Sequence, residues 1–247
     1  MRRIGIILAV VALAALGALA WQRLGPRAQR TVPIYMFHRV DPHPRDEWTL
    51  TPAAFEARLR ALHDAGRVSV TPADLVRHLR LGRPIPTNAC VITFDDGNLC
   101  VLEQADPVLR RYGFRAIVYL VTDTVHEAGE PRGNVEGWPT LKWDEVRAML
   151  ASGRFVFGSH AVHHVRLTND VDRMAELCDS ADAIERHTGM RPDSFAFPFG
   201  EGANLPGVRR ALRAAGYTSS VTVIDKPARL RPLSTDPYRL PRVWARP

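Results

Sequence analysis

The strongest constraint on the fold is a regular alternation of short apolar runs with segments of helical periodicity, which begins at about residue 32. This alternation is typical of βαβ units and of a mainly parallel sheet. A chain of 247 residues can form a single α/β barrel and does not require two domains. The runs that predict strands are residues 34–37, 68–70, 90–94, 116–121, 155–158, 195–197 and 217–223.

The segments between these runs carry the signals of helix ends. Thr51-Pro52 and Thr71-Pro72 each place a capping side chain before a proline in the first helical turn. The longest predicted helix covers residues 171–188 and ends at Gly189. Its periodicity predicts a buried face made of Met174, Leu177, Cys178, Ala181 and Ile184.

The composition, with 46% hydrophobic and 24% charged residues, excludes disordered, collagenous and coiled-coil chains. The formal net charge is +7, but the basic residues are scattered and never form a run longer than two. We expect a solvated basic surface and no nucleic-acid partner, while a weak attraction to anionic envelope surfaces stays open. Cys90, Cys100 and Cys178 lack the spacing of a thiolate zinc site, and the sequence does not decide whether two of them pair.

The first 31 residues have the layout of a targeting segment rather than of a folded domain. Arg2 and Arg3 precede residues 4–20, which are all apolar or glycine. Ala18-Leu19-Ala20 fits a cleavage site, and the stretch is also nearly long enough to span a bilayer. We therefore predict a signal peptide or membrane anchor plus linker in residues 1–31, and one exported domain in residues 32–247. That domain is expected in the cell envelope, outside the cytoplasmic membrane, either membrane-anchored or secreted.

Two adjacent carboxylates follow the apolar run at 90–94. Asp95 and Asp96 repel each other, so burying both is costly unless a cation or hydrogen bonds compensate. One interpretation is a metal ligand beside a general base. The alternative is a helix-capping pair or an Asx turn.

A second polar cluster follows the run at 155–158. His160 and His164 are four residues apart and, with one carboxylate, supply a set of three metal ligands with open positions for water and substrate. The alternative is a pair of structural histidines. Ser159 lacks the surrounding pattern of a nucleophile elbow, so a serine hydrolase is not expected. His38, at the end of the first run, is a further candidate, with a hydrogen bond to the backbone as the alternative.

These clusters together resemble the polysaccharide deacetylases of carbohydrate esterase family 4. The resemblance is carried by TFDDG at 93–97, GSHAVHH at 158–164 and FAFPFG at 195–200, and it extends from about residue 33 to 243. YMFHRV at 35–40 and YRLPR at 238–242 also resemble the family.

The resemblance implies a distorted (β/α) barrel with fewer than eight full units. It also implies a divalent metal, commonly zinc with cobalt or nickel as alternatives, bound by Asp96, His160 and His164. Asp95 would be the general base, and the backbone N–H of Phe199 would stabilise the oxyanion. Pro198 and Phe199 would contact the substrate. Trp48, Trp138 and Trp143 could stack on sugar rings, with core packing as the alternative.

The sequence also departs from the family pattern. No histidine follows His187, so the usual C-terminal general acid is missing. The exported poly-N-acetylglucosamine deacetylases instead take this histidine from the first strand, and His38 fits that arrangement. Ala161 replaces a serine or threonine, and Phe199 replaces a tyrosine. The arginine that usually orients the base is absent near residue 198, which leaves Arg242 as the candidate.

The resulting prediction is an exported hydrolase that removes N-acetyl groups from a β-linked N-acetylglucosamine polysaccharide. Its expected partners are this carbohydrate polymer and, if the N-terminal segment is retained, the membrane. Peptidoglycan, an O-acetyl ester and a lipid-linked glycan remain alternative substrates. A non-catalytic glycan-binding protein is the alternative from a different class.

Overall fold

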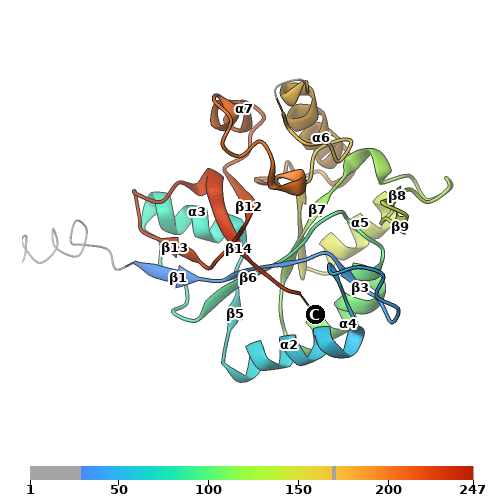
Figure 1. Cartoon of the computed structure of the whole chain (residues 1–247), viewed down its shortest axis with the longest axis horizontal. Helices are drawn as coiled ribbons and strands as arrows, with labels where there is room; N and C mark the ends of the chain where they lie inside the picture. The colour runs from blue at the N-terminus through green and yellow to red at the C-terminus, as the bar shows by residue number, and fades with distance from the viewer. Residues whose placement is uncertain (1–28, 169–170, 247) are drawn as a thin grey trace, which may run out of the picture.

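The computed structural model describes residues 29–168 and 171–246, which form a closed barrel of seven parallel strands (Figure 1). Neighbouring strands around the barrel follow the order β2, β14, β12, β11, β10, β7 and β6, and β6 pairs back onto β2. This confirms the predicted α/β barrel with fewer than eight units. The strands are β2 (Ile34–Phe37), β6 (Ala89–Phe94), β7 (Ala116–Leu120), β10 (Phe155–Ser159), β11 (Ser194–Ala196), β12 (Ser219–Asp225) and β14 (Leu240–Trp244).

Six α-helices among the described residues lie between successive strands, and the predicted helix-end signals are found at their ends. The Thr51 side chain accepts a hydrogen bond from the backbone N–H of Ala54, and Thr71 forms a capping box with Asp74. Met174 is a correction to the predicted buried face, because its side chain is 41% exposed. The helices are α2 (Pro52–Asp64), α3 (Pro72–Leu81), α4 (Asp106–Tyr112), α5 (Trp143–Ala151), α6 (Arg173–Thr188) and α7 (Val208–Ala214).

Several short elements were not predicted. β14 closes the barrel between β12 and β2, although its sequence LPRVW contains a proline and a charged residue. β5 (Val68–Ser69), by contrast, lies within the predicted strand run at 68–70 and pairs with the first half of β6. A π-helical turn, η1 (Val101–Ala105), precedes α4. The other short elements are β1 (Arg30–Val32), β3 (Arg39–Val40), β4 (Thr49–Leu50), β8 (Asn134–Val135), β9 (Trp138–Pro139), β13 (Ala228–Leu230), η2 (Thr122–Thr124), η3 (Pro198–Gly200) and η4 (Pro237–Arg239).

The barrel strands are buried as expected for parallel strands that are covered on both faces. Every residue of β6 and of β7 is buried. The largest fully buried side chains include two arginines, Arg39 and Arg242. Because buried charges need partners, these two side chains mark polar sites inside the barrel.

Two further points concern the N-terminal segment and the thiols. The predicted signal or anchor stretch falls in residues 1–28, outside the described residues. Within residues 29–168 and 171–246, no helix has the length and apolar character needed to cross a membrane. Cys90, Cys100 and Cys178 are all free thiols.

Candidate active site

The polar motifs converge at the carboxyl ends of the barrel strands, where parallel barrels carry their functional residues. His38 follows β2, Asp95 and Asp96 follow β6, and His160 follows β10. These side chains line a cleft of about 320 Å³ together with Phe199, Trp48 and Trp244. The structure therefore brings these separate motifs together in one cleft.

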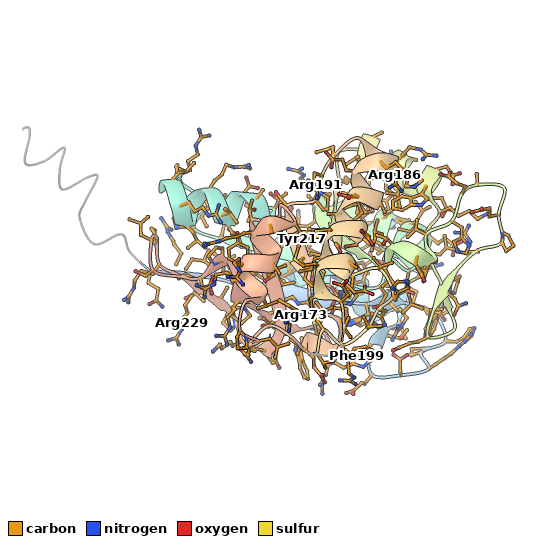
Figure 2. All side chains as sticks on the ribbon, turned by 90° about the horizontal axis from the view of Figure 1, so that it is seen from above. Arg173, Arg186, Arg191, Phe199, Tyr217 and Arg229 are labelled. Carbon is orange, nitrogen blue, oxygen red and sulfur yellow. The ribbon has the colours of Figure 1, made fainter. Side chains whose placement is uncertain are left out.

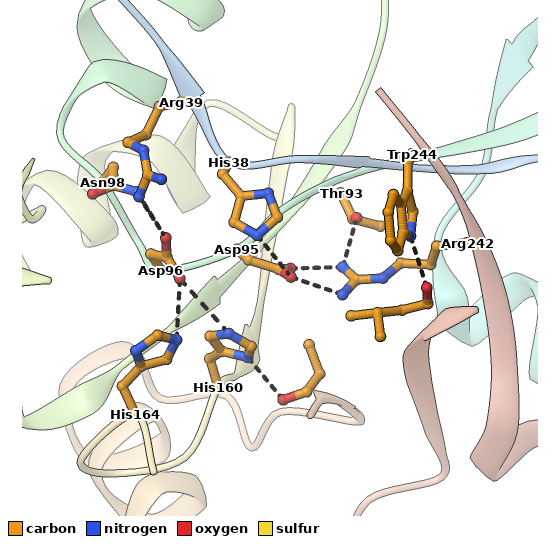
Figure 3. A network of polar contacts seen from close by, with 12 residues as sticks. His38, Arg39, Thr93, Asp95, Asp96, Asn98, His160, His164, Arg242 and Trp244 are labelled. Carbon is orange, nitrogen blue, oxygen red and sulfur yellow. Dashed lines mark hydrogen bonds and ion pairs between the residues drawn. The ribbon is translucent and has the colours of Figure 1, made fainter. Parts of the chain in front are cut away.

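Asp96, His160 and His164 form a compact group of potential metal ligands (Figure 3). One ligand atom from each residue lies within 4.8 Å of the other two. The Oδ1 atom of Asp96 is 3.7 Å from Nε2 of His160 and 3.5 Å from Nε2 of His164. Donor atoms about 2 Å from a shared ion lie within about 4 Å of each other, so both distances fit a common ion.

The loops that carry these ligands use a strained backbone. Asp96, Ala161, His164 and Phe199 have φ values of 70°, 70°, 54° and 56°, in the left-handed region that non-glycine residues rarely adopt. Only two other non-glycine residues in the described part of the chain do so, Glu136 in the cleft and Leu233. Such strain persists where the surrounding structure enforces it, and here it turns side chains from three loops towards one point.

The protonation states of the group suit a divalent cation. Nδ1 of His160 donates to the carbonyl oxygen of Ala196 at 2.8 Å, which leaves Nε2 with its lone pair facing Asp96. Burial lowers the pKa of His160 to about 3 and also lowers the pKa of His164, so both rings are neutral. Burial raises the pKa of Asp96, a cost that a bound cation would offset. The residues present therefore fit a divalent metal.

Asp95 lies beside this group and is held by a different partner. Arg242 donates to both carboxylate oxygens of Asp95 at 2.7 Å, and its own Nε donates to the carbonyl oxygen of Thr222. Burial alone would raise the pKa of Asp95, but the charge of Arg242 and the hydrogen bonds that it donates hold this pKa well below its usual range. Asp95 is thus ionised and fixed in orientation although it is 2% exposed.

His38 faces Asp95 across the cleft. Its Nε2 atom is 3.8 Å from Oδ2 of Asp95, and its side chain is 17% exposed. The ring also packs against Trp48, with the ring centroids 5.0 Å apart. Burial lowers the pKa of His38, against the opposing influence of Asp96 and Asp95.

Phe199 forms part of the cleft rim in η3. Its ring is 42% exposed, lies 4.7 Å from the ring of His164 and is covered by the guanidinium of Arg166 at 4.3 Å. Pro198, the preceding residue, is buried. Gly200 follows at φ 72°, and a Cβ atom there would lie 2.1 Å from Cγ2 of Val223. The turn that presents Phe199 therefore depends on a glycine.

Two of the predicted aromatic residues do not line the cleft. Trp138 is 7% exposed and lies beneath the guanidinium groups of Arg39 and Arg45, at 5.3 and 4.6 Å. Trp143 is 3% exposed and stacks on His187. Trp48 and Trp244 are the tryptophans that line the cleft. Ser159 is fully buried and donates to Ser180, which agrees with its exclusion as a nucleophile.

The sequence analysis missed two residues that shape the site. Arg39 is 2% exposed and donates to Oδ2 of Asp96 at 3.2 Å, the oxygen that does not face the histidines. Glu176 of α6 accepts hydrogen bonds from the backbone N–H groups of Val162 and His163, and so holds the loop between the two histidine ligands. Arg39 lies within the YMFHRV segment, but its partner Asp96 is 57 residues away. No pattern in the neighbouring sequence therefore predicts the contact.

Comparison with known proteins agrees with this arrangement. A family model described as polysaccharide deacetylase matches residues 82–220. The putative polysaccharide deacetylase YxkH of Bacillus subtilis is 24% identical over 194 residues, which cover 77% of this chain and 64% of YxkH. The poly-beta-1,6-N-acetyl-D-glucosamine N-deacetylase of Staphylococcus aureus is 21% identical over 208 residues, which cover 79% of this chain and 67% of that protein.

A solved structure shares the fold over nearly the whole of both chains. IcaB from Ammonifex degensii superposes with a TM-score of 0.77 at 25% identity, covering 88% of this chain and 93% of IcaB. The family model spans more than half of the sequence and includes the Asp95–Asp96 and His160–His164 motifs. On this evidence the chain belongs to the polysaccharide deacetylase family.

Proposed function

We propose that this protein is a metal-dependent hydrolase that removes N-acetyl groups from a β-linked N-acetylglucosamine polysaccharide. The observation that carries the proposal is that a group of possible metal ligands and a separate carboxylate lie side by side in one cleft. Asp96, His160 and His164 offer three ligand atoms within 4.8 Å, and next to them the ionised Asp95 is held by Arg242. A ligand set beside a separate carboxylate that is not itself one of the ligands is what metal-assisted hydrolysis requires.

Asp96, His160 and His164 would hold the cation, which we expect to be zinc, with cobalt or nickel as alternatives. A bound divalent ion supplies Lewis acidity that polarises the acetyl carbonyl and makes a water molecule easier to deprotonate. The hydrogen bond from His160 to Ala196 and the ion pair between Arg39 and Asp96 keep two of these three ligands in orientation.

Asp95 would act as the general base that takes a proton from the attacking water. Its low pKa means that it is ionised at neutral pH, and the two hydrogen bonds from Arg242 keep its carboxylate in one orientation. His38 would donate a proton to the nitrogen of the leaving amine as the C–N bond breaks. Because burial lowers its pKa, the ring is neutral before the reaction, and we expect it to take up the proton that Asp95, 3.8 Å away, removes from water before it donates to the nitrogen. The products are acetate and a free amine on the sugar.

The backbone N–H of Phe199 would stabilise the negative charge that develops on the acetyl oxygen. Pro198 fixes the start of the turn that presents this group. The exposed ring of Phe199, together with Trp48 and Trp244, gives the cleft apolar surfaces on which pyranose rings can pack.

The choice of substrate is supported by the relatives and by the position of His38. The related protein from Staphylococcus aureus carries the name of a poly-beta-1,6-N-acetyl-D-glucosamine N-deacetylase. We further propose that residues 32–247 are the catalytic domain and that residues 1–31 direct it to the cell envelope, anchored or secreted. The carbohydrate polymer is then its partner, and the membrane is a second partner if the segment is retained.

The test is acetate release by the full chain loaded in turn with zinc, cobalt and nickel. The substrates are β-1,6-linked N-acetylglucosamine oligomers, chitin oligomers, peptidoglycan fragments and an O-acetylated sugar. We expect the β-1,6-linked oligomers to be the best substrates. Preference for another glycan in this panel would redirect the substrate assignment, and a folded, metal-bound protein that releases no acetate from any of them would overturn the enzymatic proposal.

The Asp95→Asn variant checks the proposed base. We expect acetate release to fall by about 10²–10⁴-fold, which is the usual contribution of a general base, while metal binding is retained. Metal content measured on the purified variant separates loss of the base from loss of the ion. Near-normal turnover by Asp95→Asn would contradict the assigned role.

A further inference from the structure

One surface of the protein concentrates positive charge. Residues 207–241 contain seven basic and two acidic side chains, so this segment holds five of the seven net positive charges of the chain. Two grooves of about 720 and 490 Å³ open on it and share Arg209 and Arg239. The basic side chains that line the grooves, called the basic face below, are Arg209, Arg210, Arg213, Lys226, Arg229 and Arg239.

The charges of the basic face are poorly neutralised by the protein. All six side chains belong to exposed residues. Among the residues that the structure describes, only Arg209 of these six forms an ion pair, with Asp236. On other surfaces, by contrast, Arg154 pairs with Asp106, and Arg191 pairs with Asp182 and Glu185. A cluster of like charges without counter-charges repels itself and attracts an anionic surface.

Exposed apolar side chains occur in and next to this part of the fold. Ile224 lines the larger groove and is 42% exposed. Leu233, in the loop between β13 and η4, is 78% exposed, and its backbone N–H donates to the carbonyl oxygen of Leu79 in α3. Leu81, at the end of α3, is 65% exposed. Cations flanked by exposed aliphatic side chains match the headgroup boundary of a membrane better than they match a soluble polyanion.

The chain enters the fold at the same place. β1 pairs antiparallel with β13, and Thr31 lies opposite Arg229 in this pair (Figure 1). The apolar stretch at residues 4–20 ends ten residues before Arg30. An extended chain of that length spans at most about 35 Å. The basic face is therefore within reach of a membrane into which residues 4–20 insert.

We infer that the basic face binds the anionic headgroup surface of a phospholipid membrane, with Ile224 and Leu233 at the headgroup boundary. No described residue that lines either groove also lines the active-site cleft. In Figure 2, Arg229 lies near one end of the molecule, well separated from Phe199 at the cleft. Membrane binding through this face therefore leaves the cleft accessible to a polymer.

The test compares the full chain on phosphatidylcholine vesicles with and without phosphatidylglycerol. Sedimentation measures binding, and amide hydrogen exchange locates it. We expect phosphatidylglycerol to increase binding and to slow exchange in β13 and residues 231–236, and salt to reverse both effects. Because the N-terminal segment is present on both vesicles, the difference between them reports on the folded surface.

Matched triple variants decide whether the face or the net charge is responsible. Arg210→Gln, Lys226→Gln and Arg229→Gln together remove three cations of the basic face. Each cation close to an anionic surface changes the partition by about fivefold, so the phosphatidylglycerol-dependent binding should fall at least about tenfold. The control variant combines Arg60→Gln, Arg110→Gln and Arg186→Gln, which removes the same charge from α2, α4 and α6. This variant should change the phosphatidylglycerol-dependent binding by less than about twofold.

Three outcomes would overturn the inference. Phosphatidylglycerol could leave exchange in β13 and residues 231–236 unchanged. The two triple variants could lose binding equally, which would assign the effect to net charge alone. Soluble polyglutamate could protect β13 while vesicles do not, which would make the face a site for soluble polyanions. None of these results depends on deacetylase activity, so the inference and the proposed function fail separately.

Discussion

Arg39 shows how one buried side chain determines the geometry of the candidate metal site. It donates to Asp96 at 3.2 Å, to Asp46 at 3.1 Å and to Thr49 at 3.3 Å, while its guanidinium lies over Trp138. Arg39 donates to Oδ2 of Asp96, so Oδ1 is the oxygen that faces the two histidines. The loop after β3 is thereby coupled to the metal ligands.

The Arg39→Met variant is expected to weaken metal affinity by about 10–100-fold, because outer partners of metal ligands contribute about that much. Affinity is measured by competition with a chromophoric chelator. Arg45→Met is the matched control, since Arg45 covers the same Trp138 ring but is not among the described residues that bond to Asp96. Equal affinities for the two variants would show that Arg39 does not orient Asp96.

Gly200 is a second residue whose role is local and testable. Both Gly200 and Gly207 have φ in the left-handed region, at 72° and 79°. An added Cβ atom at Gly200 meets Val223 at 2.1 Å, whereas at Gly207 it meets nothing within 4 Å. Gly207→Ala should therefore cost only about 1–2 kcal/mol of backbone strain in the free energy of unfolding.

Gly200→Ala should cost more than Gly207→Ala, and it should also lower acetate release by displacing the turn that presents Phe199. Urea unfolding and turnover of the two variants provide the comparison. If Gly200→Ala retained full activity, the position of Phe199 would not depend on this turn.

At the scale of elements, Glu145 joins α5 to the segment that carries the β8–β9 hairpin. It accepts the backbone N–H of Lys142 at 2.7 Å, which completes the N-terminal cap of α5. It also forms a bidentate pair with Arg132, at 2.7 and 2.8 Å. Glu136, in the turn between β8 and β9, lines the active-site cleft, so this connection supports one wall of the cleft.

We expect Glu145→Gln to lower the free energy of unfolding by about 1–2 kcal/mol at neutral pH, because hydrogen bonds to a charged group are lost. Burial opposes ionisation of Glu145, but the hydrogen bonds from Arg132 and Lys142 leave its pKa below the usual value. A depressed pKa stabilises the fold above the unfolded-state pKa, and this contribution is lost as the pH falls through the folded-state value.

The difference in the free energy of unfolding between wild type and Glu145→Gln should therefore become smaller in acid. Urea unfolding at neutral pH and near pH 3 measures this difference. Asp144→Asn serves as the control, because Asp144 is an exposed residue in the same helical turn. A difference that stayed constant with pH would contradict a role for the charge.

At the scale of the whole molecule, the proposed metal ligands lie on two loops that are far apart in the chain. Asp96 follows β6, and His160 and His164 follow β10. An ion bound only by the folded state stabilises it by about 2.7 kcal/mol when its concentration is 100 times Kd. In a protein of this size, that corresponds to a rise in Tm of roughly 5–10 °C.

Chelation should therefore lower the Tm of the metal-loaded protein by that amount, as measured by differential scanning calorimetry. His160→Ala should abolish the effect of added metal. His163→Ala should retain it, because the ring of His163 bonds to Glu176 instead of facing Asp96. An identical Tm with and without metal would exclude this ion site.

The sequence by itself determined the local pattern and the chemistry of this protein. Apolar strand runs such as residues 90–94, capping residues such as Thr71 and the motifs around Asp95 and His160 are read from neighbours in the chain, because helix periodicity and strand burial act over a few residues. The tertiary structure alone decided that LPRVW closes the barrel as β14, which brings Arg242, already a candidate from the sequence, to Asp95, 147 residues away. It also decided that Arg39 meets Asp96 and that Trp48, instead of Trp138, lines the cleft. These contacts depend on how the barrel closes, and closure is a property of all the strands together, so no single segment encodes it.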